Sequence, residues 1–448
     1  MAYISLPVVT VQRDFNDVVR DVDEGVVPVD TFWVSCYKSG ESSVHAKVDV
    51  ELDEVDRNLL RFRSKEGDVD FVKSDSVSGY SIACRSLDIP PTAVVLPIQE
   101  YNDSERTNPL RPQRITAFDV SPDTTRFATG HLDGSVVIYP SASTSIQQVN
   151  TSKCKLVSKA HVSNVSSLTF FPSSRVLLST GADFSLSILS SEFPESWSES
   201  SSGLGTRVNP VRVLRAHTRG VTSACILGLG RNIISSSLDK TLRLWDVPTG
   251  DVIHTLEASA PILCTSNGPR TPTPPDGEDT PLAETQDERE MPEVAHTLTY
   301  TGLQSGSFEV FDLGTRISIY KSPSAVGGSP INAISILPAQ HLLATGAGDG
   351  VVTLYDVRSL SSPLTSFRRN DAGINDLDFS PGSTNSECGL AIATTDGLPY
   401  VASIIPEGPG VSTELIGVDC DPVQSVRVRN KSEIWSASDD AIVRRYIL

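Results

Sequence analysis

The stretch Val213–Val247 brings together the residue types of a hydrolase triad: His217, Ser235 and Asp239, followed by Trp245. In a triad, the carboxylate orients the imidazole, and the imidazole takes the proton of the hydroxyl nucleophile. The same groups can also form a buried structural network, because each polar side chain that loses water needs a hydrogen-bond partner. The residue types alone therefore allow two interpretations, a catalytic site or a structural lock.

A second copy of this spacing favours the structural interpretation. His161, Ser179 and Asp183 repeat it upstream, with Leu189 at the position of the tryptophan. A catalytic centre would not recur from one segment to the next, whereas a device that pins each unit of a repeat would. The sequence also contains no phosphate-loop motif and no His-Glu-x-x-His metal pair. We therefore expect no enzyme activity, no cofactor and no metal site.

The segment that carries the lock has the pattern of short strands. Val221–Leu227 and Asn232–Ser236 are short alternating runs bounded by turn residues, as in half-buried strands. A four-stranded unit cannot bury both of its faces alone, so the pattern predicts neighbours of the same kind. Seven such units follow from residue 114 onward. Their tight turns are at Asp133, Asp183, Asp239, Gly306, Asp349, Asp396 and Asp439.

The spacing of these turns predicts an all-β chain with a seven-bladed β-propeller over residues 92–448. A period of roughly 40–45 residues is typical of propeller blades, and the longer steps contain visible insertions. The last unit ends at its third strand, so we expect Thr92–Tyr101 to close the ring as its fourth strand. Residues 1–91 do not match the repeat, and their strand-like runs predict a small β-rich module. Asp14–Glu24 could begin there as a short helix.

A Pro-rich acidic insertion interrupts the fourth unit at residues 266–295. It contains eight acidic residues against two arginines, and it has too few apolar residues to form a core. We expect it to be a disordered loop.

Composition limits the partners and the compartment. The formal net charge of −18, without a strong local basic patch, disfavours nucleic acid and favours a basic protein partner. The alternative is that the acidity mainly serves solubility. No apolar run is long enough to span a membrane, and no secretory signal is expected. The seven cysteines show no disulfide or zinc spacing, which indicates free thiols in a reducing compartment. We expect a monomer that is cytoplasmic and nuclear.

Acidic residues gather in the predicted loops of the last two units. A solvated rim is one interpretation of this pattern, and a negative docking face for a basic partner is the other. The partner-binding candidates are Asp371, Asp376, Glu387, Asp419, Asp421 and Asp440.

The repeats resemble those of WD-repeat proteins, and the C-terminal segment resembles the proteasomal ATPase-associated factor family. That family shares a Leu-x-Gly-x-Asp-Cys-Asp-Pro-Val run, which is similar to Glu414–Pro422, and a closing Asp-Gly-Leu-Val-Arg-Arg-Tyr. Here Ala441 and Ile442 replace the Gly-Leu pair, while Val443–Tyr446 are kept. The resemblance covers most of residues 114–448 and is weak over the N-terminal module.

This resemblance implies a chaperone for assembly of the regulatory particle of the 26S proteasome. Members of the family bind the C-terminal domain of a base ATPase subunit and hold it until the ATPase ring is assembled. The partner comes from the resemblance and not from composition or periodicity. A different class of function stays open, namely a general WD-repeat scaffold such as a ubiquitin-ligase substrate receptor or a trafficking adaptor.

Overall fold

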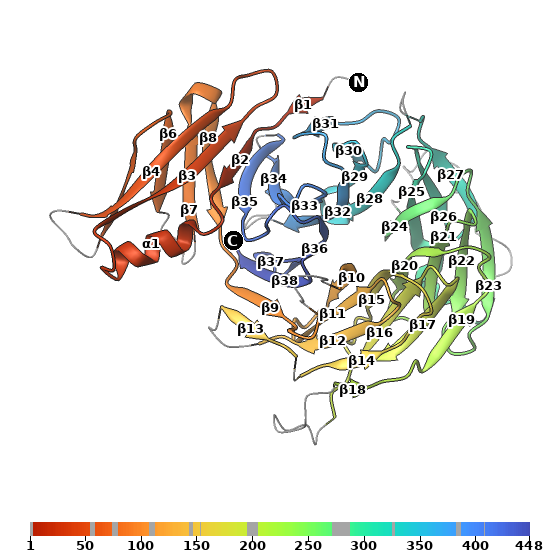
Figure 1. The fold of residues 1–448 in the computed structure, drawn as a ribbon. Coiled ribbons are helices and arrows are strands. Elements are labelled where there is room, and N and C mark those ends of the chain that lie inside the picture. The colour runs from red at the N-terminus through yellow and green to blue at the C-terminus, as the bar shows by residue number, and fades with distance from the viewer. Residues whose placement is uncertain are drawn as a thin grey trace.

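Seven four-stranded units surround a central channel in the part of the chain that the structure describes (Figure 1). The structure is a computed structural model. It describes residues 3–53, 59–73, 79–106, 113–142, 147–152, 154–194, 205–270, 287–324, 328–381, 387–406 and 408–448. The all-β, seven-bladed propeller with a small β-rich N-terminal module is confirmed. The first strand of each blade lines the channel, and the fourth lies at the rim.

The blades follow one another along the chain, and each is an antiparallel sheet. The first blade consists of β10 (Ile115–Val120), β11 (Arg126–His131), β12 (Val136–Pro140) and β14 (Leu156–Ser158). The second blade consists of β15 (Val165–Phe170), β16 (Val176–Gly181), β17 (Ser185–Ser190) and β19 (Arg212–Arg215). The third blade consists of β20 (Val221–Leu227), β21 (Asn232–Ser237), β22 (Thr241–Asp246) and β23 (Val252–Glu257). The fourth blade consists of β24 (Ile262–Pro269), β25 (Thr297–Leu303), β26 (Phe308–Asp312) and β27 (Ile317–Lys321). The fifth blade consists of β28 (Ile331–Leu337), β29 (Leu342–Ala347), β30 (Val351–Asp356) and β31 (Thr365–Arg368). The sixth blade consists of β32 (Ile374–Pro381), β33 (Cys388–Thr394), β34 (Tyr400–Ile405) and β35 (Gly410–Leu415). The seventh blade consists of β36 (Val423–Arg429), β37 (Glu433–Ser438), β38 (Ile442–Ile447) and β9 (Gln99–Asn102).

Neighbouring blades pack face to face through layers of buried apolar side chains. Between the second and third blades, Phe171, Leu178 and Trp245 belong to one such cluster. Every residue of β21 is buried, because this strand lies in the middle of a sheet with a blade on each side. Burying these side chains is the main stabilising contribution, at roughly 25 cal/mol per Å² of apolar surface.

The ring closes between the N-terminal and C-terminal parts of the propeller. Strand β9 pairs antiparallel with β38, which places Tyr101 opposite Val443. The Tyr101 ring stacks on Trp435 with centroids 5.5 Å apart. Arg444 is only 1% exposed, and its Nε lies 3.1 Å from a carboxylate oxygen of Glu100 on β9. The closure therefore combines backbone pairing, aromatic packing and a buried ion pair.

The segment that we expected to close the ring is divided between two sheets. Only its second half, β9, joins the last blade. Its first half belongs to β8 (Ile89–Val95), which pairs in parallel with β35 of the sixth blade and antiparallel with β7 (Gly79–Cys84) of the module. Strand β8 thus crosses the expected boundary at residue 91 and joins the module to the propeller in one seven-stranded sheet.

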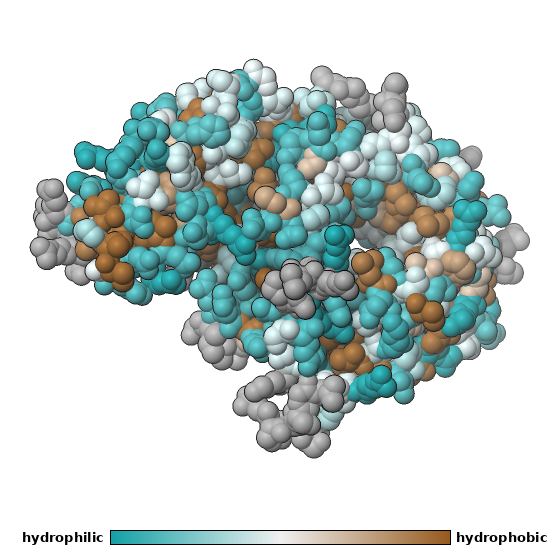
Figure 2. All heavy atoms as spheres, in the orientation of Figure 1, coloured by the Kyte–Doolittle hydropathy of each residue, from teal (hydrophilic) through white to brown (hydrophobic). Residues whose placement is uncertain are grey.

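In its described residues, the N-terminal module consists of one four-stranded sheet, the end of the seven-stranded sheet that it shares with the sixth blade, and one helix. Helix α1 (Phe15–Asp23) packs against β3 and β4. Its apolar residues Phe15, Val19 and Val22 are spaced for one helical face, and all three are buried. Its other elements are β2 (Val8–Val11), β3 (Val29–Tyr37), β4 (Val44–Leu52), β5 (Leu60–Ser64), β6 (Val69–Lys73) and the 3-10 turn η1 (Arg85–Leu87). Figure 2 shows hydrophilic residues over most of the visible face, with hydrophobic ones gathered at the far end of the module.

The insertion in the fourth blade is shorter than we expected. Ser266–Pro269 complete strand β24. On the far side of the insertion, the backbone N–H of Met291 donates to Asn232 at 2.8 Å, and η2 (Pro292–His296) leads into β25. The interval 266–295 was therefore too wide as a disordered loop. Residues 271–286 lie outside the described part of the chain. Another short turn, η3 (Pro338–Gln340), joins β28 to β29.

Four short strands extend blades at the rim. Each pairs in parallel with the fourth strand of its blade. These strands are β1 (Ile4–Ser5) on β31, β8 on β35, β13 (Gln148–Asn150) on β9, and β18 (Thr206–Arg207) on β14.

Candidate protein-binding face

The structure brings the four residues of the third-blade lock together. His217 Nδ1 lies 2.9 Å from an Asp239 carboxylate oxygen, and His217 Nε2 lies 2.7 Å from Ser235 Oγ. Trp245 Nε1 donates to the same hydroxyl at 2.8 Å. Burial lowers the pKa of His217, so the imidazole stays neutral near neutral pH. The hydroxyl is held between two ring nitrogens inside the blade, where Ser235 is fully buried.

The second-blade lock has the same geometry without the tryptophan. His161 Nδ1 lies 2.9 Å from Asp183, and its Nε2 lies 2.7 Å from Ser179 Oγ. The backbone N–H of Val162 also donates to the Asp183 carboxylate at 2.9 Å. Leu189 is buried in the apolar cluster between the first and second blades. This arrangement joins the loop before each blade to the turn between its second and third strands.

Replacing Ser235 with Ala should destabilise the protein more than replacing Ser179 with Ala. The first change leaves two ring nitrogens, His217 Nε2 and Trp245 Nε1, without a partner, and the second change affects His161 Nε2 alone. An unpaired buried polar group costs about 1–3 kcal/mol, so we expect S235A to cost about 2 kcal/mol and S179A about half of that. Urea unfolding of both variants measures the difference. Equal losses would contradict the role of the tryptophan in the lock.

Four of the acidic side chains on the last blade and its preceding loop lie close together. Asp419 and Asp421 belong to the loop between β35 and β36, and Asp439 and Asp440 form the turn between β37 and β38. Burial and the nearby carboxylates of Asp440, Asp439 and Asp419 raise the pKa of Asp421. The backbone N–H of Asp439 donates to Pro422, the residue after Asp421, at 2.9 Å, so these charges share one small region, which we call the acidic end. A cationic group placed there would relieve the repulsion.

Within the acidic end, the residues differ in their freedom to meet a partner. Asp440 is held by Arg444 at 2.6 Å, and Asp439 is 8% exposed. The Asp419 side chain is 60% exposed and is paired with Arg13 of the module at 2.8 Å. Exposed ion pairs of this kind contribute at most about 1 kcal/mol, so a partner can displace Arg13 at small cost.

The other three candidates lie elsewhere. Asp371 is on the loop before β32, at the same end of the ring one blade earlier, and its side chain is 91% exposed. Asp376 is on β32, where it faces the channel and pairs with Arg427. Glu387 precedes β33, so it lies at the opposite end of the sixth blade. The structure thus gathers Asp419, Asp421 and Asp440 and places Asp371 near them, whereas Asp376 and Glu387 belong to other surfaces.

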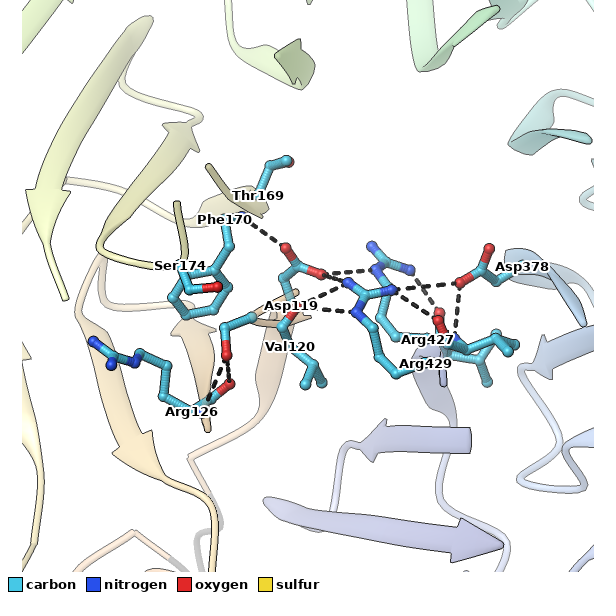
Figure 3. Close-up of polar contacts among 12 residues, drawn as sticks. Asp119, Val120, Arg126, Thr169, Phe170, Ser174, Asp378, Arg427 and Arg429 are labelled. Carbon is cyan, nitrogen blue, oxygen red and sulfur yellow. Dashed lines mark hydrogen bonds and ion pairs between the residues drawn. The ribbon is translucent and has the colours of Figure 1, made fainter. Parts of the chain in front are cut away.

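A charged network on the channel wall was not anticipated. Arg427 and Arg429 of β36 lie between Asp119 of β10 and Asp378 of β32 (Figure 3). Arg429 Nη2 is 2.8 Å from Asp119, and the backbone N–H of Phe170 donates to the same carboxylate at 2.7 Å. Burial raises the pKa of Asp378 to about 6 although both arginines oppose the rise.

This network spans three consecutive blades across the closure of the ring. It lines one side of a channel with a cavity volume of about 720 Å³, and hydroxyl and amide side chains make up half of the other lining residues. The two guanidinium groups pair with carboxylates of both neighbouring blades, so the network holds the three blades together. Among the described residues, no group of three or more His, Cys, Asp or Glu is placed to hold a metal ion. No described helix is long and apolar enough to cross a membrane.

Comparison with known proteins identifies the repeats. Residues 107–139, 152–189, 208–246 and 320–356 match the family model "WD domain, G-beta repeat". The chain is similar to pre-mRNA-processing factor 19 of Oryza sativa subsp. japonica, with 25% identity over 65% of this chain and 48% of the relative. It is 30% identical to the ribosome biogenesis protein YTM1 of Laccaria bicolor over 36% of the chain and 31% of the relative. It is 32% identical to human proteasomal ATPase-associated factor 1 over 28% of the chain and 29% of the relative. The matched stretches thus span less than half the length of these curated relatives.

Proposed function

Because the chain is a WD40-repeat protein, a class of generally non-catalytic binding scaffolds, we propose that it holds a basic partner protein at its acidic end. The carrying observation is the cluster of Asp419 and Asp421 beside Asp439 and Asp440, where the backbone N–H of Asp439 donates to Pro422 at 2.9 Å and burial and the like charges raise the pKa of Asp421. A lysine- or arginine-rich surface gains from meeting these charges without the need for a deep pocket. Such contacts guide association and are screened by salt.

We propose further that the partner is the C-terminal domain of a base ATPase subunit of the proteasome regulatory particle. Two observations support this choice. The Glu414–Pro422 run and the kept residues Val443–Tyr446 resemble the C-terminal end of the proteasomal ATPase-associated factor family. A human protein whose name associates it with a proteasomal ATPase is among the similar proteins. Other relatives carry names from pre-mRNA processing and ribosome biogenesis, so the C-terminal residues, more than overall similarity, favour the ATPase.

In this proposal the protein acts as an assembly chaperone. It binds one ATPase subunit, keeps the C-terminal domain of that subunit occupied until the ATPase ring is assembled, and then leaves. An electrostatic contact suits this role, because its association is fast and its affinity is limited by screening. The seven-bladed ring supplies a rigid support, and the proposal requires no catalytic step.

The test is affinity purification of the intact protein from cell extract, followed by mass spectrometry. The triple variant D371K/D419K/D421K reverses Asp371, which pairs with Arg368, Asp419, which pairs with Arg13, and the half-buried Asp421; none of the three is held by a buried arginine as Asp440 is. We expect the wild type to recover a base ATPase subunit and the triple variant to lose it, with association at low salt slower by about tenfold or more.

The matched control is Glu257→Lys, which reverses an exposed charge on β23 of the third blade. It should recover the ATPase as the wild type does, and circular dichroism should show both variants folded. Recovery of no base ATPase by a folded wild-type protein would sink the ATPase proposal. Recovery of a ubiquitin-ligase adaptor instead would favour the general scaffold.

A further inference from the structure

The rim of the propeller is covered at some blades and bare at others. Four blades carry an added strand, and all four additions are parallel to the strand that they join. The second, third and fourth blades end at β19, β23 and β27, and in the described residues no further strand pairs with these edges. An unpaired edge presents backbone N–H and C=O groups that can bind another strand.

Of the three bare edges, only β19 is regular along its length. Strands β23 and β27 are each interrupted by a β-bulge in their ladders with the neighbouring strand, which blunts an edge against further pairing. Strand β19 pairs with β17 without a shift of register. The ladder continues one residue upstream, since the backbone N–H of Val211 donates to Ile188 at 2.8 Å.

The side chains on this edge are unusual for a surface strand of an acidic protein. Val211 is 74% exposed and Val213 is 42% exposed, and Arg215 is exposed on the same side of the strand. Arg212 and Leu214 point the other way, toward Gly250 of the third blade. One side of the strand thus carries Val211, Val213 and Arg215, and the other side carries Arg212.

The surroundings of the edge are basic, although the chain as a whole carries a net charge of −18. Residues 205–245 contain seven lysines and arginines and one acidic residue. In the described part of the chain, no carboxylate forms an ion pair with Arg212, Arg215 or Arg219. These unpaired positive charges next to a bare edge determine which strand would bind there.

We propose that the β19 edge of the second blade binds an extended acidic segment of a partner protein as an added fifth strand. The segment pairs in parallel, as the four strands added by the chain itself do. Its side chains alternate so that apolar residues meet Val211 and Val213, and acidic residues meet Arg212 and Arg215. This site is separate from the acidic end and binds a partner of opposite charge, so it extends beyond the proposed function.

The probe is a fluorescent peptide, Thr-Val-Glu-Val-Thr-Glu-Thr, whose binding to the full chain is followed by fluorescence anisotropy. We expect saturable binding that weakens with salt, and slower amide hydrogen exchange over residues 211–215 in the complex. Val213→Lys and Arg215→Glu should each weaken binding by about tenfold, or about 1.4 kcal/mol. Ile319→Lys, at the bulge in the bare edge of β27, is the matched control and should bind as the wild type does.

Two control peptides separate strand addition from simple charge attraction. Lysine in place of each glutamate should abolish binding, and so should proline in place of the central valine, because proline cannot complete the ladder. The proposal is overturned if the proline peptide binds as well as the probe, or if V213K and R215E bind it normally. It is also overturned if a single-stranded oligonucleotide binds this edge more tightly than the peptide. Self-association that V213K removes in sedimentation experiments would instead assign the edge to a second copy of this chain.

Discussion

Replacing Glu414 with Ala should lower the free energy of unfolding by about 3–5 kcal/mol. Glu414 is 4% exposed, and its Oε1 lies 2.5 Å from Nη2 of Arg369, which is 6% exposed. The same oxygen accepts the backbone N–H of Val9 at 3.2 Å. Burial raises the pKa of Glu414, and the guanidinium opposes that rise. Removing the carboxylate would leave a buried guanidinium and a backbone N–H without their acceptor.

The comparison that isolates this effect uses an exposed ion pair. Arg13→Ala breaks the Arg13–Asp419 pair, whose two side chains are each 60% exposed, and should cost less than about 1 kcal/mol. The Glu414 contact joins the fifth and sixth blades and reaches the module through Val9, whereas the Arg13 contact joins the module to the loop before the seventh blade. The first ion pair is buried and the second is exposed. Urea unfolding of the two variants gives the two losses. A double variant, E414A/R369M, should recover much of the loss, because the uncompensated charge is gone. Similar losses for E414A and R13A would contradict the argument.

The local signals in the sequence were sufficient for the fold. Alternating strands, the turn aspartates and the repeated spacing of His217, Ser235 and Asp239 each depend on neighbours within one blade. The Glu414 contact could not be found in this way. Its partners Arg369 and Val9 are distant in the sequence, and burial of a glutamate within an acidic motif has no local signature.

The candidate site was only partly predictable, and Asp376 shows why. It is among the acidic residues expected in the loops of the last two units, although Asp376-Leu377-Asp378-Phe379 alternates as a strand does. In the structure, Leu377 and Phe379 are buried, and the two aspartates lie on the channel wall. The Val-Arg-Val-Arg run that ends at Arg429 alternates in the same way. Opposite charges alternating on the first strands of neighbouring blades were the available signal for the network.

The basic stretch around β19 was also overlooked. The charge of the whole chain hides it, since the surplus of acidic residues lies mostly outside residues 205–245. That β19 is bare cannot be read from the sequence, because the strands that cover other blades come from distant segments such as β1 and β8. Local charge was therefore visible in the sequence, whereas the open edge required the structure.

Asp119→Ala should weaken the seam where the first and last blades meet, at a cost of about 2–4 kcal/mol. Asp119 is 5% exposed and accepts three donors, from Arg427 at 3.3 Å, Arg429 at 2.8 Å and the backbone of Phe170 at 2.7 Å. The arginines keep Asp376 and Asp378 as partners, so we expect a smaller loss than for a fully isolated charge. The expected signature is faster amide hydrogen exchange in β10 and β36, measured together with urea unfolding.

The matched change is Asp378→Asn on the other side of the same arginines. Burial raises the pKa of Asp378 to about 6, so its charged form is less favoured in the fold than that of an ordinary carboxylate, and Asn resembles the neutral form. D378N should therefore cost less than D119A and should leave the exchange of β10 unchanged, because it affects the contact between the sixth and seventh blades. If D378N speeds amide hydrogen exchange in β10 as much as D119A does, the network acts as one unit around the channel. Asp119 would then have no special part in closing the ring.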